Sequence, residues 1–365
     1  MSEKHPLFTI VISGYQNESF LPKCLESIQE QTFPDFEAIC YVEESTDNSL
    51  AVCKEMSRKD SRFKLVTAQK SGSASTTRNY AIDHSEGEYL VVVDGDDWLS
   101  VDMLEKLANK LHETGMVDVV SFAFIKCRNG EEADWVHASC ETNFNANEAK
   151  GLFSGSDAIR FAWHYERTDF KAYTWLSVYR VDFLRENHLY QSDGLILEDY
   201  EWVPRVWFCA QKFSYLDEAL YAYRIHGKSV TAEVSSRTHF DLAHHFRTFI
   251  EFIKTHHVPH DIQAIWSNQW LSLFFSHIFY PAKKLSLQLN DEDRKKILKI
   301  FFNQKYKKEF WQFLLKSSLP KRLALPLIWL ASLGIQAPAK LYFSMCYYPL
   351  ARSISSPSSP LTKGI

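Results

Sequence analysis

The chain has 365 residues, of which 45% are hydrophobic, so it can bury the core of one large domain or of two ordinary ones. Its formal net charge of −4, together with the lack of a nucleic-acid reader motif, argues against a nucleic-acid-binding protein. The seven cysteines are scattered without a Cys-x-x-Cys pair, which argues against a zinc site or a disulfide framework and is typical of a cytoplasmic protein.

Strands and helices are predicted to alternate over the first 125 residues. Short apolar runs predict strands at residues 7–13, 36–42, 63–67 and 89–93. Helical spacing and capping residues predict helices that begin near residues 21, 48, 76 and 101. This order predicts a mostly parallel α/β sheet flanked by helices, with ligands bound at the carboxyl ends of the strands. The first apolar run is too short for a secretory leader, and no stretch reaches the about 20 apolar residues of a membrane-spanning helix.

Three aspartates follow the fourth predicted strand, in the sequence Asp94-Gly95-Asp96-Asp97. Asp94 and Asp96 are two residues apart, so their carboxylates point the same way while strand geometry lasts. Mg²⁺ and Mn²⁺ prefer oxygen ligands and commonly bind one or two carboxylates together with substrate phosphates. Gly95 lets the backbone approach such phosphates closely. The motif therefore predicts a site for a divalent metal and a diphosphate.

Other interpretations fit parts of this motif. An acidic turn that caps the next helix stays open, because Asp and Ser are ordinary turn and cap residues. A helix-loop-helix calcium site is disfavoured, because Leu99 occupies the sixth position, where a glycine is needed. An aspartyl-phosphate phosphatase is disfavoured because the aspartates follow the fourth strand in chain order.

Residues 8–99 resemble the nucleotide-binding half of a family 2 glycosyltransferase, an inverting enzyme with the GT-A (Rossmann-like) fold. The resemblance extends to about residue 231 and depends on five segments in family order: residues 12–18, 24–32, 43–47, 75–79 and 87–89. It implies a catalytic domain at residues 1–235 that moves a sugar from a nucleotide-diphosphate donor, expected to be a UDP-sugar. The implied acceptor is a hydroxyl of a glycan or a lipid-linked glycan in bacterial cell-surface polysaccharide or glycolipid assembly.

The resemblance also implies roles for individual residues. The donor site would comprise Tyr15, Glu18, Glu43, Arg78, Asp94, Gly95 and Asp96. The metal, Mn²⁺ or Mg²⁺, would be held by Asp94, Asp96 and His226, although a lone histidine is more often structural. The acceptor would be bordered by Asp97 and Trp175. Core packing is the alternative for Trp175.

A second acidic cluster, Glu198-Asp199, stands where family members commonly carry Glu-Asp. An inverting transfer needs a carboxylate to take the proton from the attacking hydroxyl, which typically contributes about 10²- to 10⁴-fold. The resemblance implies that Asp199 is this general base and that Glu198 orients the acceptor or the helix. The alternative is an acidic first turn that complements a helix dipole, and both interpretations are compatible.

Four residues depart from the family pattern, in which Pro, Asn, Asp and Lys are usual: they are Ser13, Gln16, Glu43 and Ser177. These departures leave open a protein of a different class, a non-catalytic nucleotide-sugar-binding protein with a degenerate GT-A fold. The intact carboxylates favour the enzyme.

The remaining residues are predicted to form a mainly helical extension at 236–352 and a disordered tail at 353–365, rich in Ser and Pro. Residues 281–325 contain twelve Lys or Arg against four Asp or Glu. One interpretation is a peripheral anchor on the cytoplasmic face of a membrane, because amphipathic segments with basic residues and tryptophan lie in the headgroup region. The other is a helical subdomain that packs on the catalytic domain.

Overall fold

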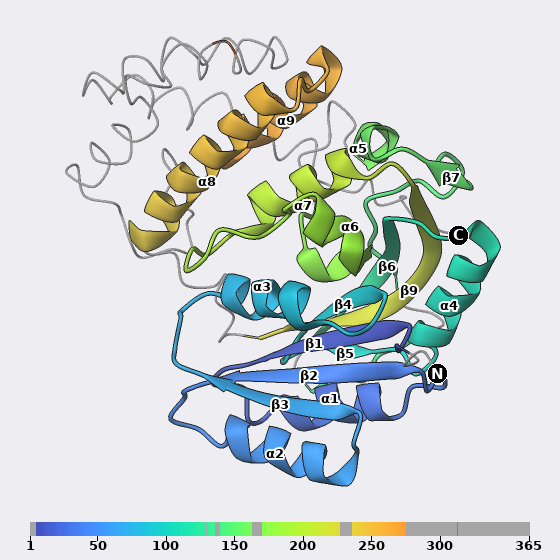
Figure 1. Ribbon diagram of the computed structural model, residues 1–365, viewed down its shortest axis with the longest axis vertical. Helices are drawn as coiled ribbons and strands as arrows, with labels where there is room; N and C mark the ends of the chain where they lie inside the picture. The colour runs from blue at the N-terminus through green and yellow to red at the C-terminus, as the bar shows by residue number, and fades with distance from the viewer. Residues whose placement is uncertain are drawn as a thin grey trace, which may run out of the picture. The chain divides into compact units, whose positions relative to one another are not determined.

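Figure 1 shows the computed structural model, which describes residues 5–128, 130–135, 139–162, 170–226, 236–274 and 312. Within these residues nine strands form one sheet in the order β3-β2-β1-β4-β8-β6-β9-β5, and β7 pairs with β9. Helices flank the sheet, so the predicted α/β fold class is confirmed.

The first four strands are parallel and agree with the predicted strands to within one residue; they are β1 (Phe8–Gly14), β2 (Phe36–Glu43), β3 (Phe63–Ala68) and β4 (Tyr89–Asp94). β1, β2 and β4 are mostly apolar because helices cover both faces of a parallel sheet, whereas β3, at the edge of the sheet, is buried only at Phe63. β1 lies between β2 and β4, with Ser13 opposite both Tyr41 and Asp94. The carboxyl ends of these strands therefore meet at one edge.

Four helices accompany these strands: α1 (Leu21–Gln29), α2 (Ser49–Lys59), α3 (Ala74–His84) and α4 (Met103–Thr114). α1 and α2 lie on one side of the sheet and α3 on the other (Figure 1). α3 begins after Ser73, whose side chain accepts a hydrogen bond from the Ser75 backbone nitrogen at 3.2 Å. Such a cap satisfies one of the backbone donors that a helix start leaves unpaired.

The second half of the sheet is more mixed than the predicted mostly parallel arrangement. Its strands are β5 (Trp98–Leu99), β6 (Val119–Arg128), β7 (Leu152–Phe153), β8 (Ser177–Arg180) and β9 (Phe213–Ile225). β8 is antiparallel to both of its neighbours, β4 and β6, whereas β6 and β9 are parallel. An antiparallel strand needs no crossover helix, and β8 directly follows the short 3₁₀ helix η1 (Thr174–Leu176). The remaining helices here are α5 (Gly155–Ala162), α6 (Val181–Glu186) and α7 (Asp199–Cys209).

The chain divides into two compact units. Among the described residues, the first contains the sheet, its helices and residues 244–257, and the second contains residues 236–243 and 258–274. α8 (Ser236–Thr255) contributes to both units and α9 (His260–Phe274) to the second, so the predicted helical character beyond residue 235 is confirmed there. None of the helices described has the length and apolar character to cross a bilayer. The basic stretch, the predicted membrane contact and the predicted tail lie outside the described residues.

Candidate active site

The aspartate motif lies at the end of β4, as its sequence predicts. Asp94 is the last residue of β4, and its Oδ1 lies 3.5 Å from Nη2 of Arg78. Asp96 Oδ2 lies 2.7 Å from Nε2 of His226, just beyond β9. Burial raises the pKa of Asp94 to about 6, although the Arg78 guanidinium opposes the shift. The two carboxylates thus face different partners at the same strand end.

Gly95 allows a close approach between two parts of the protein. A Cβ at this position would lie 2.3 Å from the Ser13 carbonyl oxygen and 2.2 Å from Nδ2 of Asn17. Asn17 also donates from Nδ2 to the Ser13 carbonyl at 3.2 Å. The aspartate turn therefore packs directly on the end of β1, close to the point where the predicted donor residues Tyr15 and Glu18 follow that strand.

Asp97 points away from the other two aspartates. It is 1% exposed, accepts hydrogen bonds from the Tyr221 hydroxyl at 2.8 Å and from the Arg224 backbone nitrogen at 2.7 Å, and so joins the motif to β9. Burial, reinforced by the neighbouring Asp96 and Asp94, raises its pKa well above the ordinary value. These hydrogen bonds anchor β9 to the aspartate motif. Contact between Asp97 and an acceptor stays a prediction.

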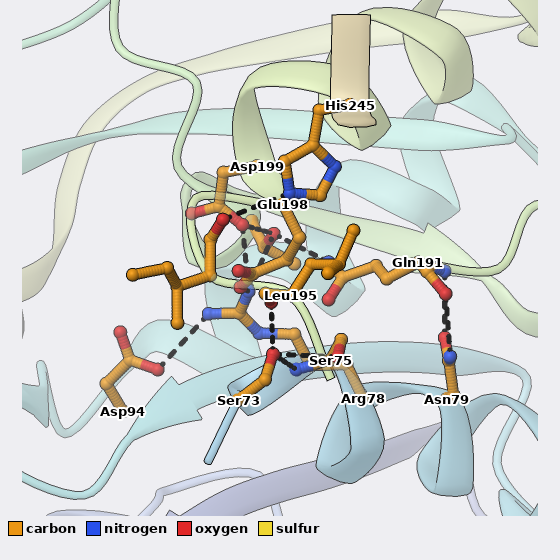
Figure 2. Close-up of polar contacts among 12 residues, drawn as sticks. Ser73, Ser75, Arg78, Asn79, Asp94, Gln191, Leu195, Glu198, Asp199 and His245 are labelled. Carbon is orange, nitrogen blue, oxygen red and sulfur yellow. Dashed lines mark hydrogen bonds and ion pairs between the residues drawn. The ribbon is translucent and has the colours of Figure 1, made fainter. Parts of the chain in front are cut away.

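Arg78 joins the two acidic clusters. It is 5% exposed on α3, and Nη1 donates to Glu198 and, at 2.8 Å, to Oδ1 of Asp199 (Figure 2). The same guanidinium reaches Asp94 through Nη2. Burying a cation is unfavourable unless it is paired, and three carboxylates supply that compensation here. The structure therefore brings together Arg78, Asp94, Glu198 and Asp199 from three separate parts of the chain.

Glu198 and Asp199 stand at the start of α7 and differ in exposure. The Glu198 side chain is 8% exposed and the Asp199 side chain 23%. Burial raises the pKa of Glu198 to about 7 against the attraction of Arg78. The Thr174 hydroxyl donates to Oδ1 of Asp199, the oxygen that Arg78 also contacts. Among the described contacts, none involves Oδ2 of Asp199, and the Asp199 side chain is the more exposed of the two.

The predicted nucleoside residues lie at the ends of two strands: Tyr15 and Glu18 follow β1, and Glu43 is the last residue of β2. The Glu18 carboxylate accepts hydrogen bonds from the backbone and side-chain nitrogens of Asn48, at 2.7 and 2.8 Å, and thereby ties the two loops together. Glu43 accepts a hydrogen bond from Ser71. The Tyr15 hydroxyl lies 2.5 Å from Nζ of Lys70. Their contacts with a nucleotide stay predictions, and Lys70 and Ser71 are neighbours that sequence reasoning missed.

Trp175 belongs to an aromatic stack. It is 3% exposed and stacks on Tyr221 with ring centroids 4.2 Å apart and on Tyr173 at 4.7 Å. This arrangement matches the core-packing alternative, in which a large ring fills space between strands. A contact between Trp175 and an acceptor sugar stays a prediction, and the buried stack gives it no support.

The residues present fit a divalent cation only in combination with a phosphate ligand. Asp94 and Asp96 supply carboxylate oxygens, and their side chains are 28% and 29% exposed. In the part of the chain that is described, no cluster of three or more His, Cys, Asp or Glu side chains could hold a metal. Nε2 of His226 is bonded to Asp96, and the imidazole packs against Phe20 with ring centroids 4.7 Å apart. Two carboxylates plus substrate phosphates is a common ligand set for Mg²⁺.

Comparison with known proteins agrees with the fold. Residues 9–174 match the model of the family described as glycosyl transferase family 2. This match covers somewhat less than half of the chain, and it agrees with the family resemblance seen in the sequence.

Several bacterial glycosyltransferase sequences and one solved structure are similar to the chain. It is 29% identical over 229 residues to the uncharacterized glycosyltransferase EpsJ of Bacillus subtilis. The aligned region covers 62% of this chain and 63% of EpsJ, so the chain spans less than two thirds of that relative. A poly(ribitol-phosphate) beta-glucosyltransferase of Bacillus spizizenii is 35% identical over 104 residues, 28% of this chain and 16% of that protein. Residues 1–349 of TarS from S. aureus, crystallised with UDP-GlcNAc, superpose with a TM-score of 0.65 at 20% identity, over 92% of this chain and 91% of that one. At this identity the likeness to TarS shows a shared fold.

Proposed function

We propose that the chain is a metal-dependent inverting glycosyltransferase that moves a sugar from a UDP-sugar to an acceptor hydroxyl in bacterial cell-surface glycan assembly. The observation that carries this proposal is the cluster in which Arg78 contacts Asp94 on one side and Glu198 and Asp199 on the other. Because one guanidinium contacts both Asp94 and Asp199, this cluster supports a proposal in which Asp94 serves a diphosphate-bound metal and Asp199 serves an acceptor hydroxyl. The family match and the UDP-GlcNAc complex of TarS support the donor class.

In this proposal Asp199 is the general base. Its Oδ1 is held by Arg78 and Thr174, so Oδ2 is the oxygen that takes the proton from the acceptor hydroxyl. As that hydroxyl oxygen bonds to the anomeric carbon, the bond from this carbon to the diphosphate oxygen breaks, and its electron pair leaves with UDP. Attack opposite to the leaving group inverts the anomeric centre. Glu198, which is more buried, holds Arg78 rather than contacting the acceptor.

Asp94 and Asp96 would hold Mn²⁺ or Mg²⁺ together with the phosphates, and the cation would neutralise charge on the departing diphosphate. His226 would orient Asp96 through the bond between Nε2 and Oδ2. In this arrangement the histidine supports a ligand rather than acting as one.

Binding of a nucleotide panel tests the donor site directly. UDP, GDP, CDP, UDP-glucose and UDP-GlcNAc are each added with and without Mn²⁺, and the melting temperature of the protein is followed, because a ligand of the native state raises it. We expect manganese-dependent stabilisation by UDP and by a UDP-sugar. Asp96→Ala should abolish the manganese-dependent part, whereas Asp102→Ala, a change of a half-buried aspartate that precedes α4 and pairs with Lys106, should keep it. Undiminished stabilisation of Asp96→Ala would remove the metal assignment.

Catalysis is tested separately by release of UDP from UDP-glucose and UDP-GlcNAc, with water or poly(ribitol phosphate) as the acceptor. The poly(ribitol phosphate) probe follows from the name of the B. spizizenii relative. Specific nucleotide binding without release of UDP to any acceptor would favour the alternative, a non-catalytic nucleotide-sugar-binding protein.

A further inference from the structure

The segment from residue 191 to residue 198, which leads into α7, is held by side chains of α3. Asn79 and Gln191 exchange two hydrogen bonds, in which Nδ2 of Asn79 donates to the Gln191 carbonyl at 2.9 Å and the Gln191 backbone nitrogen donates to Oδ1 at 2.8 Å. Oγ of Ser75 accepts from the Gly194 backbone nitrogen at 3.1 Å, and Ser73 donates to the Leu195 carbonyl. α3, which carries Arg78, therefore also fixes the backbone that precedes Glu198.

A second contact to this segment comes from α8. Nε2 of His245 lies 3.0 Å from the carbonyl oxygen of Ile196 (Figure 2). A carbonyl oxygen only accepts, so Nε2 of the imidazole carries the hydrogen in this bond. His245 is fully buried, at 0% exposure, and Ile196 lies three residues before Asp199. Neither the motifs of the sequence nor the proposed mechanism assigns a role to this histidine.

The residue between these contacts and the acidic pair has a strained backbone. Leu197 has φ of +63°, in the left-handed region that a residue with a Cβ rarely adopts. It directly precedes Glu198, and its carbonyl accepts from the Tyr200 backbone nitrogen at 3.3 Å. A conformation of this kind persists only where the surroundings determine it, and it is often found at functional sites. The bond from His245 ends on Ile196, the residue directly before Leu197.

We propose that His245 is a positioning residue for transfer: its hydrogen bond to Ile196 holds Leu197 in the left-handed conformation and so aims Asp199 at the acceptor. The inference depends on the proposed role of Asp199 as the base. Because His245 contacts neither donor nor acceptor in this account, its loss should lower kcat while the KM for the donor stays unchanged.

The test uses the full chain with UDP-GlcNAc or UDP-glucose as donor and water as acceptor. His245→Ala should lower kcat for UDP release about 10- to 100-fold, the size expected when a reacting group is misplaced by about 1 Å. His245→Gln keeps a side-chain N–H that can donate to the Ile196 carbonyl and should recover most of the rate. His244→Gln changes the exposed neighbour on α8 and should match the wild type.

A double-mutant cycle with Leu197→Gly separates positioning from a general structural role. Glycine adopts positive φ without the steric penalty, so it should need the His245 bond less. In the Leu197→Gly background, His245→Ala should therefore cost less than about threefold in kcat. An equal loss of kcat in both backgrounds, or a loss that His245→Gln does not recover, would overturn the proposal.

Amide hydrogen exchange of residues 191–201 distinguishes failure of this inference from failure of the proposed function. The inference predicts faster exchange in this segment for His245→Ala but not for His244→Gln. Unchanged exchange together with unchanged kcat would overturn it, even if Asp199 is the base. Faster exchange in His245→Ala, together with an Asp199→Asn variant that is still active, would instead remove the assignment of Asp199 as the base. His245 would then still hold the segment before α7.

Discussion

Arg78 Nη1 lies 2.8 Å from Oδ1 of Asp199, although the two residues are 121 positions apart. The same side chain contacts Asp94, at the end of the strand that carries the aspartate motif. One buried guanidinium therefore sets the position of the predicted base relative to the predicted diphosphate site. The donor role implied for Arg78 by the family resemblance and this structural role are compatible, because the side chain lies between both clusters.

Removing the charge of Arg78 should destabilise the fold. Arg78→Met leaves three carboxylates without their shared cation, and breaking a buried ion pair costs about 3–5 kcal/mol. We expect the free energy of unfolding, measured by urea denaturation, to fall by about 3 kcal/mol or more and release of UDP to stop. Arg160→Met, which removes an exposed pair with Asp157, should cost less than about 1 kcal/mol. Equal stability of the two variants would show that the acidic cluster does not depend on Arg78.

The free energy of unfolding should fall as pH rises because of Glu198. Its pKa in the folded protein, about 7, lies above the ordinary 4.5, so the folded state binds the proton more tightly. The stabilisation is complete below pH 4.5 and is lost as pH rises through 7. Between pH 5 and pH 8, the wild type should lose roughly 2–3 kcal/mol relative to Glu198→Gln. A difference between the two proteins that stays constant across this range, or grows with pH, would contradict the assigned pKa.

Gly95→Ala should disturb the aspartate turn through a steric clash. The added Cβ would meet the Ser13 carbonyl oxygen at 2.3 Å, and overpacking of this kind costs about 1–3 kcal/mol. Because the turn carries both Asp94 and Asp96, we also expect weaker manganese-dependent stabilisation by UDP. The melting temperature with and without UDP and Mn²⁺ gives both quantities. A variant that is as stable as the wild type and binds UDP equally well would show that the turn moves without consequence.

Substitutions of Trp175 separate packing from an acceptor contact. Because the ring is stacked and buried, Trp175→Ala should lower the free energy of unfolding by about 3–5 kcal/mol. Trp175→Phe keeps part of the stack and should cost less, with an unchanged KM for poly(ribitol phosphate). A tenfold rise of that KM in Trp175→Phe, with the melting temperature preserved, would instead support the acceptor contact predicted from the sequence.

Local patterns were sufficient to predict the first half of the fold. The four apolar runs form β1 to β4 because each run is short and bounded by polar turns, and Asp94 is the last residue of β4, as predicted. The antiparallel placement of β8 between β4 and β6 depends on pairings between distant segments, which hydrophobic periodicity does not encode. The predicted mostly parallel sheet was therefore correct only for the strands that alternate with helices.

The site shows the same limit. The sequence singled out Glu198 and Asp199. It did not single out Thr174, whose hydroxyl donates to Asp199, or His245, whose imidazole bonds to the Ile196 carbonyl. Isolated polar residues of this kind carry no periodic signal in a sequence. Asp97 has the same residue type as Asp94 and Asp96, yet its side chain turns toward β9. Only the backbone after the strand end decides which of the three carboxylates is buried.

The most direct test of the proposed function compares wild type, Asp199→Asn and Asp182→Asn, an exposed control on α6. The measurement is the initial rate of UDP release from a UDP-sugar, alongside thermal stabilisation by the same donor with Mn²⁺. We expect Asp199→Asn to bind the donor as the wild type does and to lose at least about 10²-fold in rate, while Asp182→Asn keeps both. An Asp199→Asn variant that releases UDP at the wild-type rate would contradict the assignment of Asp199 as the general base.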